Sequence, residues 1–453
     1  MKRFTALLLA VIMLLGLASC KNGPEGEQTG AVSPDEVFMS TENFSVSLGE
    51  ATYLYYEIFN SYYSNNAEHV GFLALDAEQS LKIQDYSEGY TWYEFFLDET
   101  KAQLEWMLLY CEAANAAGYT ITDEIKNEAK DVVTSINQFA VDYAYDPIEY
   151  IHTQYGDIVT EDYIRSYLEK YFLANKFYDD LVKGYTFTEA EEDAYLAANP
   201  DKFKYVDIVT YTMRESLDRE ASANAMELRD TATEEEFYSY ITNYEDKVIN
   251  KEVGVDLYDY YAKMDNQISD WAFSAEVGEK YVYSDTLNGA YTVCMLVTPP
   301  TLQEYNVRDM RIIVLDKDRY NTFELALQRK DEVIKKWEEG DATAESFSAL
   351  AKIYSADENA EYGSTYSDVD KSFDLFTEES ITWLFEEAKP GEINSFEYDN
   401  GYFIIYCEAE GRTQWRVLAS DYLAEEKYYK DLEGFKAAHP VTFNENMAWH
   451  IDH

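Results

Sequence analysis

The chain has 453 residues, which corresponds to about three domains at roughly 100–200 residues per domain. Hydrophobic residues make up 47% of the sequence and charged residues 27%, with 8 prolines and 19 glycines, so the composition is that of a folded globular protein. The 36 basic and 87 acidic side chains leave a net charge of −51, which repels nucleic acids and anionic membrane surfaces, and we expect no nucleic-acid partner.

The first twenty residues have the pattern of a bacterial lipoprotein signal peptide. Lys2 and Arg3 precede an apolar run over residues 4–17, which is shorter than the roughly 20 residues that a membrane-spanning helix needs. The run ends on Leu-Ala-Ser-Cys20, which resembles a lipobox, in which the cysteine thiol accepts a diacylglyceryl group before cleavage. We predict a signal peptide over 1–19 and a lipid anchor on Cys20 that holds an extracytoplasmic protein on the membrane. The alternative is an ordinary secretory signal peptide with a chance cysteine.

Residues 20–36 are rich in glycine and polar side chains and lack apolar periodicity, which predicts a flexible tether. Beyond the tether, Cys111, Cys294 and Cys407 lie far apart and form no CxxC pair, so we expect buried thiols rather than disulfides or metal ligands. The five histidines are equally scattered. The sequence therefore predicts neither a metal site nor a cofactor.

Residues 37–200 are predicted to form an all-helical module. Thr122 is followed by two acidic residues, a pattern that is typical of a helix start. Ile136, Phe139 and Tyr143 then recur at the helical spacing and mark one buried face.

After Pro200 the pattern changes to strands and helices that occur twice, over residues 201–300 and 301–415. Each copy begins and ends with a β-rich segment and carries helix-compatible sequence in between. Three features of the first copy recur about 112 residues later, namely Trp271 as Trp383, Gly278 as Gly391 and Asn288 as Asn400. This repeat predicts two copies of one α+β unit.

The last stretch, residues 416–453, has a helix-like pattern over 417–436 and a short strand-like segment at 440–443. We expect this tail to return to the helical module.

The second copy resembles a parvulin-type peptidyl-prolyl isomerase domain. The resemblance lies in the order of its segments: a strand over 307–315, a helix with a serine-aspartate turn over 346–357, Gly391-Glu-Ile, and a closing strand from Asn400.

The helical half resembles the chaperone module of SurA-like and PrsA-type extracytoplasmic foldases. This likeness is carried by residues 91–97 and 188–203, and residues 420–432 resemble the C-terminal helix that rejoins that module in the family. The resemblance implies an α+β protein in which a helical chaperone module is combined with two tandem parvulin-like domains.

The resemblance also indicates site residues in the second copy. An active parvulin has a histidine in its first strand and another in its last, which surround an acid or thiol; alignment places Arg311 and Phe403 at these two positions. Asp357 matches the acid, and Phe385 with Trp383 matches the wall of the proline pocket. In the first copy neither the histidine nor an acid is found, which implies a catalytically degenerate domain.

Three functional hypotheses follow. The first is a membrane-anchored chaperone or foldase that binds unfolded, newly secreted polypeptides and whose parvulin-like domains act as scaffolds. The second is an active peptidyl-prolyl isomerase that uses Asp357 despite the two replaced histidines. The third is a surface lipoprotein that binds solutes or glycans. Client proteins and oligomeric state are left open.

Overall fold

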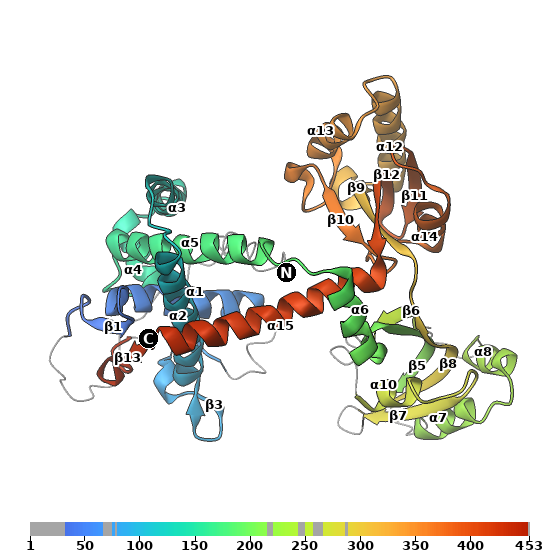
Figure 1. Ribbon diagram of the computed structural model, residues 1–453, viewed down its shortest axis with the longest axis horizontal. Coiled ribbons are helices and arrows are strands. Elements are labelled where there is room, and N and C mark those ends of the chain that lie inside the picture. Colours follow the sequence, from blue (N-terminus) through green and yellow to red (C-terminus); the bar gives the residue numbers. More distant parts are fainter. Residues whose placement is uncertain are drawn as a thin grey trace. The chain divides into compact units, whose positions relative to one another are not determined.

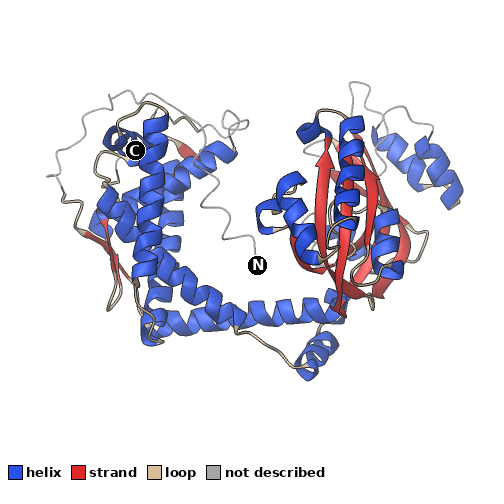
Figure 2. Ribbon diagram, turned by 90° about the horizontal axis from the view of Figure 1, so that it is seen from above, coloured by secondary structure: helices blue, strands red, loops and turns tan. Residues whose placement is uncertain are grey.

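The computed structural model describes residues 32–66, 75–77, 79–214, 221–242, 250–256, 266–285 and 289–451 (Figure 1). The predicted signal peptide, Cys20 and the tether as far as residue 31 lie outside the described residues. The chain divides into two compact units, Met1–Thr186 with Ala424–His453 and Phe187–Leu423, which we call the helical unit and the sheet unit. The long strands lie in the sheet unit, whereas the helical unit is built mainly of helices (Figure 2).

The helical unit has one hydrophobic core, to which residues from both ends of the chain contribute. Its elements are β1 (Val37–Ser40), β2 (Ser45–Ser47), α1 (Leu48–Asn65), the 3-10 turn η1 (Leu81–Ile83), β3 (Asp85–Ser87), β4 (Tyr90–Thr91), α2 (Trp92–Ala116), α3 (Asp123–Asp142), α4 (Pro147–Tyr155), α5 (Glu161–Lys183), the C-terminal part of α15 (Gln414–Ala438), β13 (Thr442–Phe443) and the 3-10 turn η5 (Glu445–Met447).

The longest helices start where the sequence offers a side-chain cap. Thr91 and Glu94 form a capping box at the start of α2, in which each side chain binds the backbone N–H of the other residue. Thr122 accepts a hydrogen bond from the backbone N–H of Ile125 and starts α3. The helix that was predicted from Thr122 is therefore present, with Ile136 on its buried side.

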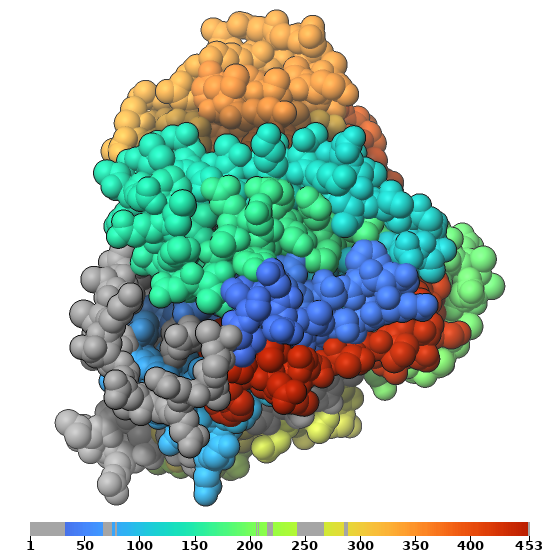
Figure 3. All heavy atoms as spheres, turned by 90° about the vertical axis from the view of Figure 1, so that its left-hand side faces the viewer, coloured from blue at the N-terminus to red at the C-terminus, as the bar shows by residue number. Residues whose placement is uncertain are grey.

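The two ends of the described chain meet in a small sheet. The prediction of an all-helical module over residues 37–200 is therefore wrong at its start, where β1 and β2 are strands. Strand order is β13-β1-β2, and Met39 of β1 is paired with Phe443 of β13. The rings of Phe38 and Phe443 meet edge to face at 5.1 Å. Figure 3 shows the N-terminal segment in blue beside the C-terminal segment in red on one face of this unit. The chain ends pair because a lone extended segment leaves its backbone N–H and C=O groups unsatisfied.

The sheet unit contains two four-stranded antiparallel sheets with the same topology. The strand orders are β6-β5-β8-β7 and β10-β9-β12-β11, so the first strand of each copy lies between the second and the fourth. The elements of the first copy are β5 (Lys204–Arg214), α7 (Ala221–Arg229), α8 (Glu234–Thr242), β6 (Asn250–Asp256), α10 (Asn266–Ala272), β7 (Lys280–Asp285) and β8 (Ala290–Leu302). Those of the second are β9 (Asn306–Asp316), α11 (Lys317–Tyr320), α12 (Phe323–Glu338), α13 (Ala344–Tyr354), the 3-10 turn η3 (Ala360–Tyr362), β10 (Thr365–Val369), α14 (Glu378–Thr382), the π-helical turn η4 (Trp383–Glu387), β11 (Ile393–Tyr398) and β12 (Gly401–Thr413).

The two copies also share one turn in atomic detail. Gly278 and Gly391 have φ angles of 83° and 93°, which a residue with a Cβ rarely adopts. Each glycine donates its backbone N–H to a carbonyl of the last strand, Leu296 in the first copy and Cys407 in the second, at 2.8 Å in both. The glycines that the sequence repeat matched therefore have the same conformational role.

An ion cluster joins the start and the end of the sheet unit. Glu192 of α6 (Glu189–Ala198) is 1% exposed and accepts hydrogen bonds from Arg412, Arg416 and Ser420. Burial alone would raise the pKa of Glu192, but these hydrogen bonds outweigh it and hold the pKa below its ordinary value. Helix α6 and the 3-10 turn η2 (Pro200–Phe203) thus belong to the sheet unit, whereas the sequence placed residues up to 200 in the helical module.

Two helices of the helical unit end in the same hydrogen-bonded motif but with different residues. After α2, Gly118 has a φ of 87° and Tyr119 donates its N–H to the carbonyl of Ala114. After α3, Ala144 has a φ of 62° and Tyr145 donates its N–H to the carbonyl of Ala140. Both ends are Schellman motifs, in which the left-handed residue is usually glycine. Ala144 therefore stores backbone strain that Gly118 avoids.

We expect Ala144→Gly to raise the free energy of unfolding by about 0.5–1 kcal/mol, because the strain at this residue exceeds the added flexibility of the unfolded chain. The matched change Gly118→Ala is expected to lower it by about 1 kcal/mol, since a Cβ there meets no atom within 4 Å and only the backbone is strained. Urea denaturation followed by circular dichroism measures both. Destabilisation by Ala144→Gly would contradict the prediction.

Candidate functional site

The predicted site residues lie in the second copy, whose sheet has two differently covered faces. One face carries Met310, Ile312 and Val314 of β9 and is lined by aromatic side chains; we call it the aromatic face. Its aromatic residues are Tyr366, Phe373, Phe376, Trp383, Phe385, Phe396, Tyr398 and Phe403. The other face carries Ile313 and Leu315 and is covered by α12 and α13.

Asp357 lies at the aromatic face, directly after α13. Its Oδ1 accepts a 2.6 Å hydrogen bond from the hydroxyl of Tyr366. Its backbone N–H and that of Val314 both donate to the buried hydroxyl of Ser355, at 3.1 and 2.9 Å, which ties the turn to the middle of β9. Its Oδ2 is buried and has no hydrogen-bond partner among the described residues. One carboxylate oxygen is therefore hydrogen-bonded, and the other is enclosed by the protein without a hydrogen bond.

Tyr366 was not among the predicted residues. Burial raises its pKa, and the hydrogen bond to Asp357 raises it further, so the phenol stays protonated and remains a donor at neutral pH. Asn359 donates from its side-chain amide to the same hydroxyl at 2.9 Å. No sequence pattern marks Tyr366, because its contact with Asp357 depends on the pairing of β10 with β9.

Phe385 and Trp383 both lie at the aromatic face and are half-buried. The ring of Phe385 meets that of Tyr305 edge to face at 5.4 Å, and the Lys371 ammonium lies 4.8 Å from the centre of the Tyr305 ring. The ring of Trp383 lies 5.7 Å from that of Phe396. These rings form an apolar wall that is partly accessible to solvent.

The structure separates the two residues that alignment placed at the family histidine positions. Phe403 is fully buried in the aromatic face, opposite Phe396 in the strand register. Arg311 is paired with Tyr406 and lies on the other face, under α13, because successive residues of a strand point to opposite sides. Met310, and not Arg311, shares the face with Asp357. The sequence contains no histidine between residues 153 and 438, so the aromatic face has no imidazole.

The side chain of Arg311 is held by other side chains and a backbone carbonyl of the same copy. Its guanidinium binds both carboxylate oxygens of Glu408, at 2.8 and 2.9 Å, and donates to the carbonyl of Ala344 and the hydroxyl of Ser348. These bonds attach α13 to the sheet. They hold the pKa of Glu408 below its ordinary value.

The first copy has a similar aromatic pair on the matching face, where Trp271 stacks on Tyr281 at a ring distance of 5.7 Å. A counterpart of Asp357 would fall in residues 243–249, which lie outside the described residues.

The helical unit exposes a second apolar surface where α3 turns into α4, which we call the aromatic tip. It consists of Val141, Tyr143, Tyr145 and Ile148, which are 48–62% exposed. These four are among fifteen large apolar side chains that are exposed in the described residues, and they fall within eight positions. Tyr143 and Tyr145 contact the half-buried rings of Phe139 and Tyr150.

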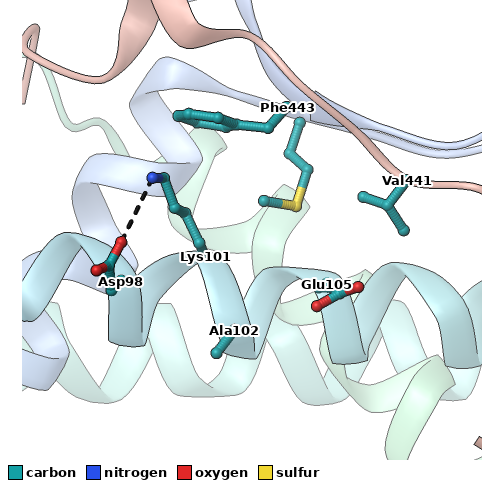
Figure 4. A pocket seen from close by; sticks show the side chains of 7 residues that line it. Asp98, Lys101, Ala102, Glu105, Val441 and Phe443 are labelled. Atoms are coloured by element: carbon teal, nitrogen blue, oxygen red, sulfur yellow. Dashed lines mark hydrogen bonds and ion pairs between the residues drawn. The ribbon is translucent and has the colours of Figure 1, made fainter.

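The helical unit also has a pocket of about 350 Å³ between α2 and the sheet of the chain ends (Figure 4). It is lined by Met39, Asp98, Lys101, Ala102, Glu105, Val441 and Phe443. Sequence reasoning missed it because Val441 and Phe443 lie more than 300 residues from the α2 residues that face them.

Within the described ranges, no group of three or more His, Cys, Asp or Glu residues is placed to hold a metal ion. Cys111, Cys294 and Cys407 are buried, and none of the three forms a disulfide within the part of the chain that the structure describes. No helix in the same ranges is long and apolar enough to cross a membrane.

Comparison with known proteins finds no matching family model and no matching curated protein. Similar solved structures include the foldase protein PrsA from Lactococcus lactis, at 14% identity and a TM-score of 0.20, covering 70% of this chain and 93% of that one. PrsA from Streptococcus pneumoniae is 12% identical with a TM-score of 0.20, over 61% of this chain and 96% of that one. A SurA-like chaperone from Campylobacter jejuni is 11% identical with a TM-score of 0.16, over 58% and 81%.

We expect Arg311→Lys to lower the free energy of unfolding of the sheet unit by about 1–2 kcal/mol, because lysine cannot bind Glu408 at two points or reach Ala344 at the same time. The pKa of Glu408 is depressed in the folded state, so the pair stabilises above the ordinary glutamate pKa and this contribution is lost as pH falls through the folded-state value. The difference from the unmodified protein should thus shrink below about pH 4.

Urea denaturation at several pH values measures this effect. Arg229→Lys is the matched control, because Arg229 of α7 forms an exposed ion pair with Asp230 in the same unit. Equal losses in both variants would contradict the structural role of Arg311.

Proposed function

We propose that this protein is a membrane-anchored extracytoplasmic chaperone that binds unfolded segments of newly secreted polypeptides. The observation that supports this most directly is the aromatic tip, a cluster of exposed apolar side chains on the helical unit. The sequence resemblance to SurA-like and PrsA-type foldases, the predicted signal peptide and the predicted lipid anchor on Cys20 point in the same direction.

The aromatic tip suits a partner without fixed structure. Tyrosine rings combine an apolar body with a polar hydroxyl and gain contact area at little cost in side-chain entropy, so they tolerate many partner sequences. The rings of Tyr145 and Tyr150 lie 5.9 Å apart, and those of Phe139 and Tyr143 lie 4.6 Å apart. The half-buried rings thus support the exposed ones, and the tip presents a firm surface.

The acidic surface of the chain adds a second property. A net charge of −51 keeps a protein with exposed apolar groups soluble, because molecules of the same charge repel one another. The same field attracts basic segments of an unfolded chain, and salt weakens this attraction. Two copies of the chain are not expected to associate through such a surface.

Prolyl isomerisation by the second copy is the alternative function, and the position of Asp357 favours it. Its carboxylate is held by Tyr366 at the aromatic face, which also carries the half-buried rings of Phe385 and Trp383. An isomerase needs a shaped apolar pocket that favours the twisted amide more than it needs a nucleophile. The face lacks both family histidines, which is why we place this activity second.

We expect the chain that starts after Cys20 to suppress aggregation of an unfolded client, and Tyr143→Ser with Ile148→Ser to weaken this at least about tenfold. Each side chain contributes roughly 1 kcal/mol or more when it leaves water, and 1.4 kcal/mol corresponds to a factor of ten. Light scattering during dilution of a denatured client measures the effect.

The matched control is Tyr429→Ser with Ile353→Ser, which removes a tyrosine and an isoleucine that are 56% and 60% exposed outside the aromatic tip. If both double variants suppress aggregation as well as the unmodified protein, the aromatic tip is not the client surface.

For the alternative, we expect Asp357→Asn to leave aggregation suppression intact. If the second copy is an isomerase, this change slows the proline-limited phase of client refolding toward the uncatalysed rate of tens of seconds or longer. Stopped-flow fluorescence of a client with a native cis proline measures that phase. An unchanged slow phase with and without the unmodified protein would exclude the isomerase function.

A further inference from the structure

The pocket of the helical unit has an apolar floor and a charged rim. Met39 and Phe443 are register partners on β1 and β13, so their side chains stand next to each other on the sheet face that looks toward α2. Val441 and Ala102 complete the apolar part. The volume of about 350 Å³ lies in the range of small binding sites and accommodates one large apolar side chain.

Two of the three charged rim residues already have partners. Lys101 pairs with Asp98 at 3.4 Å, and its ammonium lies 4.4 Å from the centre of the Phe443 ring. Asp98 also accepts a 2.8 Å hydrogen bond from the hydroxyl of Tyr90. Figure 4 shows this pair at one end of the pocket.

Glu105 is the remaining charge. Its side chain lies one helical turn from Lys101, toward Val441, and no hydrogen bond or ion pair involves it in the described part of the chain (Figure 4). The pocket therefore combines an apolar floor with one negative charge that lacks a counter-ion.

We propose that this pocket binds a polypeptide segment in which a large apolar side chain stands next to a lysine or arginine. The inference rests on the proposed chaperone function and names the class of client segment that it selects. The apolar side chain enters between α2 and β13, and the neighbouring cation pairs with Glu105.

Other occupants fit less well. A second copy of this chain carries a net charge of −51 and meets the rim with like charge. The tether sequence over 21–31 has no large apolar side chain to fill the floor. An acidic peptide finds Lys101 already paired with Asp98 and Glu105 opposed to it. Charge complementarity thus favours a basic, apolar segment.

The test uses the chain that starts after Cys20 and three fluorescent peptides on a Gly-Ser background, which contain Leu-Lys, Leu-Glu or Ser-Lys. Fluorescence anisotropy at low salt is expected to show Leu-Lys bound at least about fivefold more tightly than either other peptide. Only this peptide has both an apolar side chain for the floor of the pocket and a cation for Glu105.

Three variants locate the binding. Glu105→Gln should reduce the preference for Leu-Lys over Leu-Glu to about twofold or less, since it removes the unpaired charge. Glu99→Gln is the matched control, because Glu99 is an exposed acid on the same helix outside the pocket lining, and it should leave the preference unchanged. Ala102→Trp fills the pocket from an exposed helix position and should remove the preference for Leu over Ser.

The measurements test the proposed binding site and the proposed chaperone function separately. The proposed binding site would be wrong if Glu105→Gln and Glu99→Gln had equal effects. It would also be wrong if Ala102→Trp, shown by circular dichroism to be folded, kept the preference for Leu. Aggregation suppression by the unmodified chain, measured in parallel, reports on the chaperone function alone. Selective binding of Leu-Lys that is lost in Glu105→Gln supports the pocket whether or not aggregation is suppressed.

Discussion

The pairing of β1 with β13 is the contact on which the helical unit depends. It joins residues about 400 positions apart, and the same end of the chain supplies Trp449, which stacks on Tyr93 at 5.1 Å. Without the C-terminal strand, Phe38 and Met39 lose the neighbour that covers them. The long insertion between the two strands is tolerated because the entropy of closing a loop grows only slowly with its length, by about 0.6 kcal/mol per doubling. The pocket beside α2 exists only because this pairing brings Val441 and Phe443 there.

Within the sheet unit, the alternation of side chains along β9 decides which residues can act together. Met310 and Arg311 are neighbours in sequence, yet one lies with Asp357 at the aromatic face and the other holds α13 on the opposite face. A large, partly buried cation that already binds Glu408 at two points is not available to a substrate. At the aromatic face, Asp357 instead accepts a hydrogen bond from Tyr366.

Charge and apolar surface have complementary roles in the proposed chaperone. The aromatic tip and the pocket offer places for apolar side chains of a client, and the acidic surface keeps the protein soluble while attracting basic segments. The pocket combines both properties, because its apolar floor lies beside the negative charge of Glu105.

Much of the local structure could be predicted from the residues alone. Thr122 caps a helix, Gly278 and Gly391 form equivalent turns, and the repeated order of strands and helices predicted two α+β copies, because caps, turns and periodicity depend on residues close in the chain. The site was predicted only in part: Asp357, Phe385 and Trp383 do share one face, but Tyr366 and the pocket were missed and Arg311 was placed with Phe403. Those contacts were decided by the tertiary structure, because strand register and the meeting of the chain ends set which face a side chain occupies and which distant residues it touches.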